Sequence, residues 1–562
     1  MNLETKNATK TKILCVLDGF GLRISDANNS VAKAKMPNFR NLLSNYPWTT
    51  LMADGESVGQ EAGLVGNSEV GHMNLGAGRL IPQLSFQITK SAQNSFKLDN
   101  NLAPDQLIDP EVFLIDKWNL ETNKSNTVHL VGLFSTGTIH SDLRHWIGAI
   151  EVAGKARASK IVLHLISDGR DSDRQSLGST WDYFLETFKE RLLPFEDKIF
   201  LGSLGGRFYA MDRDNNWDRV KKGLGAILNF KIEDQVYKKF SSDTNASFDQ
   251  IKPLISEITV TSYADQIFDE SIYPNFISNK IEENDTVWLL NFRTDRMKQL
   301  SQMLCDLNQT ENLGLTILSM NDYGIDPKYK YFPIFKNKPV QNTLAEQISS
   351  SGKTQLHLAE TEKYNHVTYF FNGGQNQKWA GEDWMVIPSN KVNSHAEKPE
   401  MKTREVTQYL LENGLGKYDY IVVNYAAPDM VGHTGDIAAC ILALEVLDMQ
   451  LGLLIKAVED GDHTLIITAD HGNVEFVGDY LARRISPFEV GQMLNLTDTE
   501  HNPNPVPFIL VTKNPQPEIL TKYDLEYLKD LNLENPQSWL LEAQIPKPKL
   551  PLSKAGELWL KI

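Results

Sequence analysis

The 562-residue sequence predicts an α/β fold built on mainly parallel sheets. Short apolar runs without alternation recur along the chain, and such runs are typical of strands that are buried on both faces of a parallel sheet. Helical patterns separate these runs. An alternation of strands with helices favours parallel sheets whose faces are covered by helices.

The predicted elements can be followed in chain order. The strand-length runs lie at residues 13–17, 128–133, 161–166, 199–204, 287–290, 315–318, 421–423, 465–468 and 507–511. Residues 141–156 place Leu143, Ile147, Ile150 and Ala153 at helical spacing, and residues 437–458 repeat Leu and Ile in the same way. We therefore expect a helix with one apolar face over each of these two segments.

Two proline-bearing stretches predict linkers between domains. One lies at 80–86 and contains Pro82, and the other lies at 331–340 and contains Pro333 and Pro339. If the two stretches act as a pair of hinges, the segment between them is a domain inserted into a second domain that both chain ends build.

Composition narrows the function classes. The chain is 41% hydrophobic and 23% charged, which is ordinary for a globular protein. Lys and Arg number 56 and Asp and Glu number 72, and the net charge of −16 disfavours a nucleic-acid binder. Cys15, Cys305 and Cys440 lie far apart, which excludes a disulfide scaffold and fits a reducing compartment. No apolar stretch has the length of a secretory or membrane-spanning segment, so we expect a cytoplasmic protein that does not engage a membrane.

Carboxylates and imidazoles gather beside four of the predicted strands. In open α/β sheets, ligands bind beyond the carboxyl ends of the strands. Carboxylates and imidazoles without thiolates suit divalent manganese or zinc, and three Asp with three His exceed the usual supply for one ion. Each residue alone could equally be a turn or cap residue. The candidate ligands are Asp18, Asp429, His433, Asp470, His471 and His501.

A glycine-rich stretch at 63–76 contains the candidate nucleophile, Ser68. Ser68 lies where a loop is expected to enter a helix, and the free N–H groups of a helix N-terminus favour a phosphate. A serine hydroxyl near a metal ion can be activated to attack phosphorus. The alternative interpretation is a simple N-cap serine.

A series of ordered motifs resembles one enzyme family. They are LDGFG at Leu17–Gly21, GLVGNSEVGHMNLGAGR at Gly63–Arg79, STGTIHSD at Ser135–Asp142, SDGRDSDR at Ser167–Arg174, GGRFYAMDRD at Gly205–Asp214, NFRTDR at Asn291–Arg296, ETEKYNHVTYFFNGG at Glu360–Gly374, PDMVGHTGD at Pro428–Asp436, TADHGN at Thr468–Asn473 and HNPNPVP at His501–Pro507. Together they resemble the cofactor-independent (2,3-bisphosphoglycerate-independent) phosphoglycerate mutases of the alkaline phosphatase superfamily.

The resemblance implies a fold and a reaction. Residues 1–84 and 336–562 would form an alkaline-phosphatase-like domain, split by an inserted transferase domain at 85–335. The reaction would be the glycolytic and gluconeogenic interconversion of 3-phosphoglycerate and 2-phosphoglycerate through a phosphoserine at a two-metal site, without 2,3-bisphosphoglycerate. The family precedent implies a monomer and two divalent ions, with Mn²⁺ the expected metal.

The resemblance also implies residue roles. One ion would be held by Asp429, His433 and His501, and the other by Asp18, Ser68, Asp470 and His471. Ser68 would become phosphorylated, with Lys363 beside it, and Asp171 would be the general acid and base. The substrate contacts, which also include Lys363, would be His140, Arg170, Asp171, Arg207, Arg213, Arg293 and Arg296. Guanidinium groups suit the carboxylate and phosphate of phosphoglycerate.

Two other functions stay open at this point. A metal-dependent phosphomonoesterase, or another phosphomutase of the same superfamily, would share the metal ligands and differ in the arginine-bearing segment. A protein that binds a phosphoryl ligand without turning it over would need the same residues but no chemistry.

Overall fold

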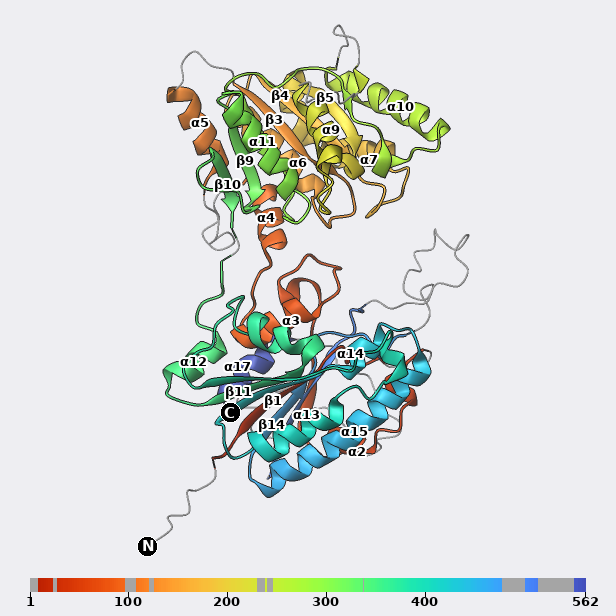
Figure 1. Cartoon of the computed structure of the whole chain (residues 1–562), viewed down its shortest axis with the longest axis vertical. Helices are drawn as coiled ribbons and strands as arrows, with labels where there is room; N and C mark the ends of the chain where they lie inside the picture. Colours follow the sequence, from red (N-terminus) through yellow and green to blue (C-terminus); the bar gives the residue numbers. More distant parts are fainter. Residues whose placement is uncertain are drawn as a thin grey trace. The chain divides into compact units, whose positions relative to one another are not determined.

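The computed structural model describes residues 9–23, 28–96, 108–120, 126–229, 238–239, 246–336, 338–477, 501–513 and 550–561. The chain forms two compact units (Figure 1). Unit 1 consists of Met1–Gln83 and Pro339–Ile562, and unit 2 of Leu84–Lys338. The chain looks longer than members of the family it resembles near residues 99–126 and after residue 514, and parts of both segments lie outside the described residues.

Unit 1 is built on an eight-stranded sheet with the order β12-β11-β13-β1-β14-β15-β2-β16. Its neighbours are parallel except for β15, which runs antiparallel to β14 and to β2. The strands are β1 (Lys12–Leu17), β2 (Trp48–Met52), β11 (Gln355–Glu360), β12 (Glu382–Ile387), β13 (Tyr420–Tyr425), β14 (Thr464–Thr468), β15 (Val506–Thr512) and β16 (Leu550–Pro551).

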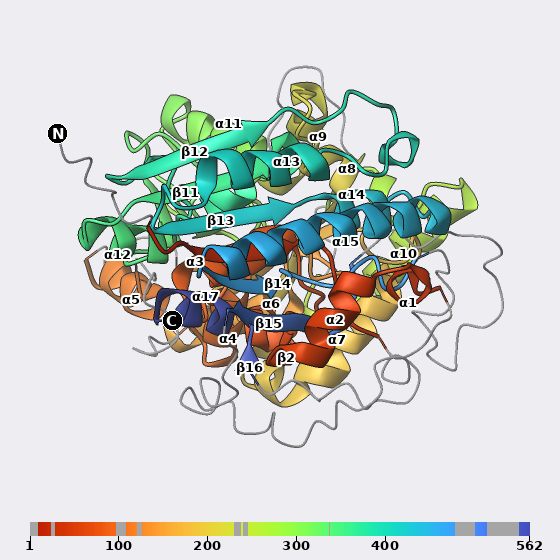
Figure 2. The same cartoon turned by 90° about the horizontal axis from the view of Figure 1, so that it is seen from below.

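Helices cover both faces of this sheet (Figures 1 and 2). One group comprises α1 (Ser30–Lys33), α2 (Pro37–Asn45), α13 (Thr403–Tyr409), α14 (Ala427–Gly432) and α15 (Ile437–Asp460). The other comprises α3 (Ser68–Ala77), α12 (Leu344–Ser350) and α17 (Ser553–Lys561). Helix α15 is the one helix in the described part of the chain that is long and apolar enough to span a membrane, and 56% of its most apolar window is buried inside the protein. Leu444, Leu447 and Leu451 on its inner side are fully buried in the core of unit 1.

Unit 2 has a second eight-stranded sheet with the order β10-β9-β8-β3-β4-β5-β7-β6, in which only the β5–β7 pair is antiparallel. Its strands are β3 (Thr127–Phe134), β4 (Lys160–Ser167), β5 (Ile199–Gly206), β6 (Lys238–Lys239), β7 (Asn275–Phe276), β8 (Thr286–Leu289), β9 (Thr316–Asn321) and β10 (Tyr331–Phe335). One face packs against α4 (Leu84–Gln93), α5 (Pro110–Leu120), α6 (Leu143–Lys155), α7 (Leu177–Leu192) and α10 (Phe248–Ala264). The other packs against α8 (Arg207–Ala210), α9 (Trp217–Leu228) and α11 (Lys298–Thr310).

The predicted fold class is confirmed, since each predicted apolar run forms or overlaps a strand of one of two mainly parallel sheets. The two boundaries between the units, after Gln83 and after Lys338, fall within the two predicted linker stretches, but the second stretch is not a linker over its first five residues. Tyr331–Phe335 is strand β10, which among the described strands pairs with β9 alone. Pro333 is tolerated there because β10 is an edge strand, where a missing N–H interrupts no hydrogen bond on the open side.

Candidate active site

Three aspartates converge at the carboxyl ends of neighbouring strands in unit 1. Asp18 follows β1, Asp470 lies two residues beyond β14, and Asp429 lies in α14, which follows β13. Strand β1 lies between β13 and β14 in the sheet, so their carboxyl ends share one edge. All three carboxylates are buried.

Ser68 is the first residue of α3, and the residue before it caps the helix. Asn67 Oδ1 accepts a hydrogen bond from Val70 N at 3.0 Å, so the Ser68 hydroxyl is not used as the cap. Ser68 Oγ instead lies 2.9 Å from His471 Nε2 and donates to Asp18 Oδ1 at 3.2 Å. The N-cap interpretation of Ser68 is therefore wrong.

Helix α3 packs closely against Asp470 and Phe371 because it carries glycine at both points of contact. A Cβ atom added to Gly71 would lie 2.6 Å from the backbone oxygen of Asp470, and one added to Gly76 would lie 2.0 Å from that of Phe371. These positions leave no room for a side chain, and the backbone of α3 therefore packs directly against the site.

Lys363 links the serine to two of the aspartates. It follows β11, is buried, and places Nζ 2.7 Å from Ser68 Oγ, 2.7 Å from Asp18 Oδ1 and 2.6 Å from Asp429 Oδ2. Burial alone would lower the pKa of Lys363, but the carboxylates of Asp18 and Asp429 raise it above its ordinary value. The side chain is therefore an ammonium group.

One group of ligand atoms surrounds Asp429 Oδ1. His433 Nε2 lies 3.3 Å away and His501 Nε2 lies 3.4 Å away, and the two imidazole nitrogens are 3.1 Å apart. His501 is oriented by its Nδ1, which lies 3.0 Å from the carbonyl oxygen of Gly66. His471 is close enough that its ligand atom, with those of Asp429 and His501, fits within 4.8 Å.

A second group joins Asp18, Asp470 and His471, whose ligand atoms also lie within 4.8 Å of one another. His471 Nε2 is 3.7 Å from Asp18 Oδ1 and 3.4 Å from Asp470 Oδ2. Asp470 Oδ2 is buried and accepts no hydrogen bond from a described residue. An unsatisfied buried carboxylate oxygen beside an imidazole and a second carboxylate fits a divalent cation.

The electrostatics of the three carboxylates also fit a bound cation. Burial and the charge of Asp470 raise the pKa of Asp18 to about 6. Burial would also raise the pKa of Asp429, but Lys363, His433 and His501 hold it well below its usual range. Three buried carboxylates thus face one ammonium group, and further positive charge would relieve their repulsion.

Sequence reasoning missed the polar residues that hold these carboxylates. His72 Nδ1 lies 2.9 Å from the carbonyl oxygen of Ser68 and 3.3 Å from Asp470 Oδ2. Asn424 Nδ2 donates to Asp18 Oδ2 at 2.6 Å and lies 3.0 Å from His72 Nε2. Asn473 Nδ2 donates to Asp429 Oδ1 at 2.7 Å.

In unit 2, a buried arginine joins two aspartates that follow β4. Arg207 Nη1 donates to Asp168 Oδ1 at 2.6 Å and to Asp171 Oδ2 at 2.5 Å. His140 Nε2 lies 3.7 Å from Asp171 Oδ2, and burial together with Arg207 lowers the pKa of His140 to about 4. His140 is therefore a neutral imidazole at neutral pH.

The other predicted arginines lie around this group. Arg213 and Arg293 both contact Asp295, at 3.3 and 3.2 Å, and Arg170 contacts Glu270 at 3.4 Å. Arg296 donates to the carbonyl oxygen of Met211 at 3.1 Å. Burial lowers the pKa of Arg296, and the charges of Arg207, Arg213 and Arg170 lower it further, which places four guanidinium groups within electrostatic reach of one another. Asp168 and Asp295 belong to this cluster and were not predicted.

Comparisons with known proteins agree with this geometry. A family model described as the Metalloenzyme superfamily matches residues 10–532. The 2,3-bisphosphoglycerate-independent phosphoglycerate mutase of Clostridium botulinum is 37% identical, with 90% of this chain and 92% of the relative covered. The enzyme of the same name from Mycoplasma genitalium is 35% identical, with 94% and 97% covered. A solved structure of Leishmania mexicana phosphoglycerate mutase at low cobalt concentration is 26% identical, covers 92% of each chain and has a TM-score of 0.53.

Proposed function

The chain belongs to the 2,3-bisphosphoglycerate-independent phosphoglycerate mutases within the Metalloenzyme superfamily, and from this premise we propose that Ser68 carries the phosphoryl group between the two oxygens of the substrate. It is an isomerase that acts on phosphoglycerate. The proposal concerns the residues that perform the reaction and the metal ions that assist them.

The surroundings of Ser68 Oγ carry the proposal. The hydroxyl contacts an ammonium group, a carboxylate and an imidazole within 3.2 Å, and it lies in the first turn of α3. Lys363 and the N–H groups of the helix end supply positive potential where a transferring phosphoryl group gathers negative charge. A hydroxyl that served only as a structural cap would not need these partners.

We assign the first metal position to Asp429, His433 and His501, and the second to Asp18, Ser68, Asp470 and His471. The closeness of His471 to Asp429 and His501 means that the two positions adjoin. Two divalent ions, which we propose to be Mn²⁺, would supply Lewis-acid stabilisation of anionic oxygens and would ease the ionisation of the serine hydroxyl.

The first half-reaction moves the phosphoryl group to the enzyme. The Ser68 proton leaves toward Asp18 Oδ1, which already accepts its hydrogen bond at 3.2 Å. Ser68 Oγ bonds to phosphorus as the bond between phosphorus and the O3 atom of 3-phosphoglycerate breaks. Asp171 gives a proton to O3, and the glycerate remains bound.

The second half-reaction reverses these roles. Asp171 takes the proton of the 2-hydroxyl, whose oxygen bonds to phosphorus while the bond to Ser68 Oγ breaks. Ser68 regains its proton, and 2-phosphoglycerate is the product. The phosphoserine must be shielded from water throughout, because its hydrolysis would make the enzyme a phosphatase.

The arginine cluster of unit 2 supplies the binding group for the glycerate. We propose that His140, Arg170, Arg207, Arg213, Arg293 and Arg296 hold its carboxylate and hydroxyl groups, with Asp171 beside them. A protein with a net charge of −16 can thus bind a small polyanion, because the positive charge is gathered locally. We further propose a cytoplasmic monomer, and the three free, buried cysteines are consistent with a reducing compartment.

The decisive experiment traps the phosphoserine. Wild-type protein is mixed with 3-phosphoglycerate and Mn²⁺, quenched in acid and digested, and mass spectrometry should find phosphate on Ser68. The Ser68→Ala variant should keep the wild-type circular dichroism spectrum and lose mutase activity. Near-normal turnover by that variant would refute the assignment.

A second assay separates the mutase from the phosphomonoesterase alternative. The wild-type protein is incubated with 3-phosphoglycerate without bisphosphoglycerate, with Mn²⁺ or with a chelator. We expect 2-phosphoglycerate to form only with metal, and free phosphate to stay at the background level. Release of phosphate as the main product would instead favour a phosphatase.

A further inference from the structure

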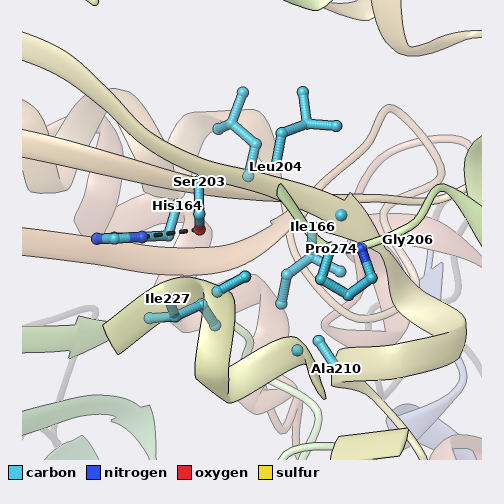
Figure 3. A pocket seen from close by; sticks show the side chains of 12 residues that line it. His164, Ile166, Ser203, Leu204, Gly206, Ala210, Ile227 and Pro274 are labelled. Atoms are coloured by element: carbon cyan, nitrogen blue, oxygen red, sulfur yellow. Dashed lines mark hydrogen bonds between the residues drawn. The ribbon is translucent and has the colours of Figure 1, made fainter. Parts of the chain in front are cut away.

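A chain of four buried polar side chains crosses the sheet of unit 2, away from the cluster that binds the glycerate. Asp285 Oδ2 lies 3.1 Å from His129 Nε2, His129 Nδ1 lies 2.9 Å from His164 Nε2, and His164 Nδ1 lies 2.8 Å from Ser203 Oγ. All four side chains are at most 3% exposed. Figure 3 shows the last of these contacts, with His164 directed at Ser203.

The four groups can share their protons so that each contact has one donor and one acceptor. When His129 is a neutral imidazole that donates from Nε2 to the carboxylate of Asp285, its Nδ1 accepts from His164 Nε2. His164 Nδ1 is then an acceptor, and the hydroxyl of Ser203 donates to it. Burial, and then His129, hold the pKa of His164 well below its ordinary value, so this imidazole is neutral. Each ring nitrogen of His129 and His164 has one partner among the four side chains.

This arrangement resembles the polarised serine of a hydrolase, but its surroundings leave no space for a substrate. The cavity beside Ser203 has a volume of about 10 Å³, which is room for one water molecule at most. It is lined by His164, Ile166, Ser203, Ala210, Ile227 and Pro274 (Figure 3). The four groups therefore act on the fold and not on a ligand of their own.

Each contact among the four side chains links neighbouring strands of the sheet. Asp285 immediately precedes β8, His129 lies in β3, His164 in β4 and Ser203 in β5, and these strands are consecutive in the sheet. A one-residue slip turns every side chain of a strand to the other face, but in a strand that is apolar and buried on both faces the slipped side chains are still buried. Polar partners inside such strands can meet in one register only. The β4–β5 pairing shifts register between Leu163 and His164, and His164 lies opposite Ser203 after the shift.

The same four strands carry the glycerate-binding cluster at their carboxyl ends. His140 follows β3, Arg170 and Asp171 follow β4, Arg207 follows β5, and Arg293 and Arg296 follow β8. A slip of one residue would move a strand by about 3.3 Å relative to its neighbour. That shift exceeds the 2.6 and 2.5 Å distances by which Arg207 holds Asp168 and Asp171.

We propose that the Asp285–His129–His164–Ser203 chain is a positioning element for substrate binding, which fixes the register of β8, β3, β4 and β5 and thereby the spacing of the arginine cluster. The proposal rests on the glycerate-binding role assigned to that cluster. It predicts that a change at Ser203, which touches no substrate-binding residue, alters substrate affinity.

The test compares two buried serines of unit 2. Ser203→Ala removes the last donor of the chain, and Ser301→Ala is the matched control, because Ser301 is buried in α11 and donates only to the carbonyl oxygen of Met297. Both variants should melt at a lower temperature than the wild type. Only Ser203→Ala should raise the KM for 3-phosphoglycerate, by about tenfold, with a smaller change in kcat. Ser203→Thr keeps the hydroxyl and should restore much of the affinity.

A second measurement uses the wild-type protein and does not depend on any variant folding. ¹⁵N NMR of the imidazoles should show that His129 and His164 are both protonated at Nε2 and unprotonated at Nδ1. An unchanged KM in Ser203→Ala, or Nδ1-protonated tautomers, would overturn the proposal. Loss of the proposed function itself would look different, because wild-type protein and Ser301→Ala would then both lack mutase activity.

Discussion

Asn67 caps helix α3 and thereby leaves the adjacent Ser68 hydroxyl to contact Lys363, Asp18 and His471. The cap predicts that Asn67 affects both the stability of α3 and, through the position of Ser68, the activity. Asn67→Ala should lower the free energy of unfolding by about 1 kcal/mol, because an orphan N–H of the helix loses its acceptor. It should also reduce activity, since α3 positions Ser68. Asn67→Ser keeps a capping oxygen and serves as the control in urea titrations and turnover assays. Equal stability of both variants would contradict the role of the cap.

Among the described residues, Lys363 is the sole ammonium group within contact distance of the three site carboxylates, so its removal should destabilise the protein most when no metal is bound. Lys363→Met should destabilise metal-free protein by about 3–5 kcal/mol, because it leaves buried charges unpaired. Mn²⁺ should recover part of this loss by supplying positive charge. Urea unfolding with EDTA and with Mn²⁺ measures both effects. Lys353→Met removes a largely exposed ion pair with Asp419 and should cost less than about 1 kcal/mol. A loss of the same size in both variants would argue against the role of Lys363.

The number of bound metal ions per chain should fall when either of the two ligand groups is disrupted. His501→Ala removes a ligand from the group around Asp429, and Asp470→Asn weakens the group that contains Asp18 and His471. We expect each variant, after dialysis against Mn²⁺, to hold one ion per chain fewer than the wild type by elemental analysis. Unaltered stoichiometry in either variant would show that the substituted residue is not a ligand.

Arg207 should not be replaceable by lysine. Its guanidinium holds Asp168 and Asp171 together and has further N–H donors for a substrate, whereas an ammonium group is a point charge. Arg207→Lys should reduce kcat/KM by about 10²-fold, because a small displacement of Asp171 disturbs proton transfer. Arg219→Lys alters a half-exposed contact with Asp212 and should leave kcat/KM unchanged. Steady-state kinetics on 3-phosphoglycerate compare the two, and a loss of less than threefold in Arg207→Lys would count against its role.

Stability should fall in mild acid, and one of the groups responsible is a buried histidine of unit 2, which holds none of the proposed metal ligands. His145 is fully buried against Thr89, and burial lowers its pKa from 6.5 to about 4. Below pH 6.5 the unfolded chain binds a proton that the folded chain does not bind until about pH 4. The stabilising contribution is therefore complete above pH 6.5 and is lost as the pH falls toward 4, by about 3 kcal/mol.

The check is the slope of unfolding free energy against pH. His145→Gln should make the slope between pH 6.5 and 4 shallower by the contribution of one proton, because one of the titrating groups is gone. Thr89→Val removes the hydrogen-bond partner but no titrating group, and it should keep the wild-type slope. A slope that His145→Gln leaves unchanged would assign the acid sensitivity to other groups.

The sequence predicted site residues best where carboxylate or imidazole side chains directly follow a predicted strand. Asp18, Asp470 and His471 could be predicted because each follows an apolar run, and the sheet order brings those runs together. His72 was missed although it lies four residues after Ser68, one helical turn away and on the same face of α3. Asn424 was missed because only the fold shows that it faces Asp18.

The buried histidines of unit 2 lie inside predicted strands, where the apolar pattern alone gave no reason to single them out. His129 and His164 interrupt runs of apolar residues within β3 and β4, and their only visible effect on the pattern is a slightly less apolar strand. Their partners are 35 to 156 residues distant in sequence, so no local pattern could pair them. Asp168 contacts Arg207, 39 residues away, and Asp295 contacts Arg213, 82 residues away, so these two long-range contacts were hidden for the same reason.

Helix α3 sets a limit on engineering the protein for heat resistance. Replacing glycine by alanine inside a helix is a standard stabilising change, because alanine favours the helix by about 1 kcal/mol. At Gly71 and Gly76 the methyl group would meet backbone oxygens at 2.6 and 2.0 Å, and backbone cannot move aside as a side chain can. A design based on helix propensity would select these two positions, and the alanine variants would lose stability and displace Ser68, which α3 positions.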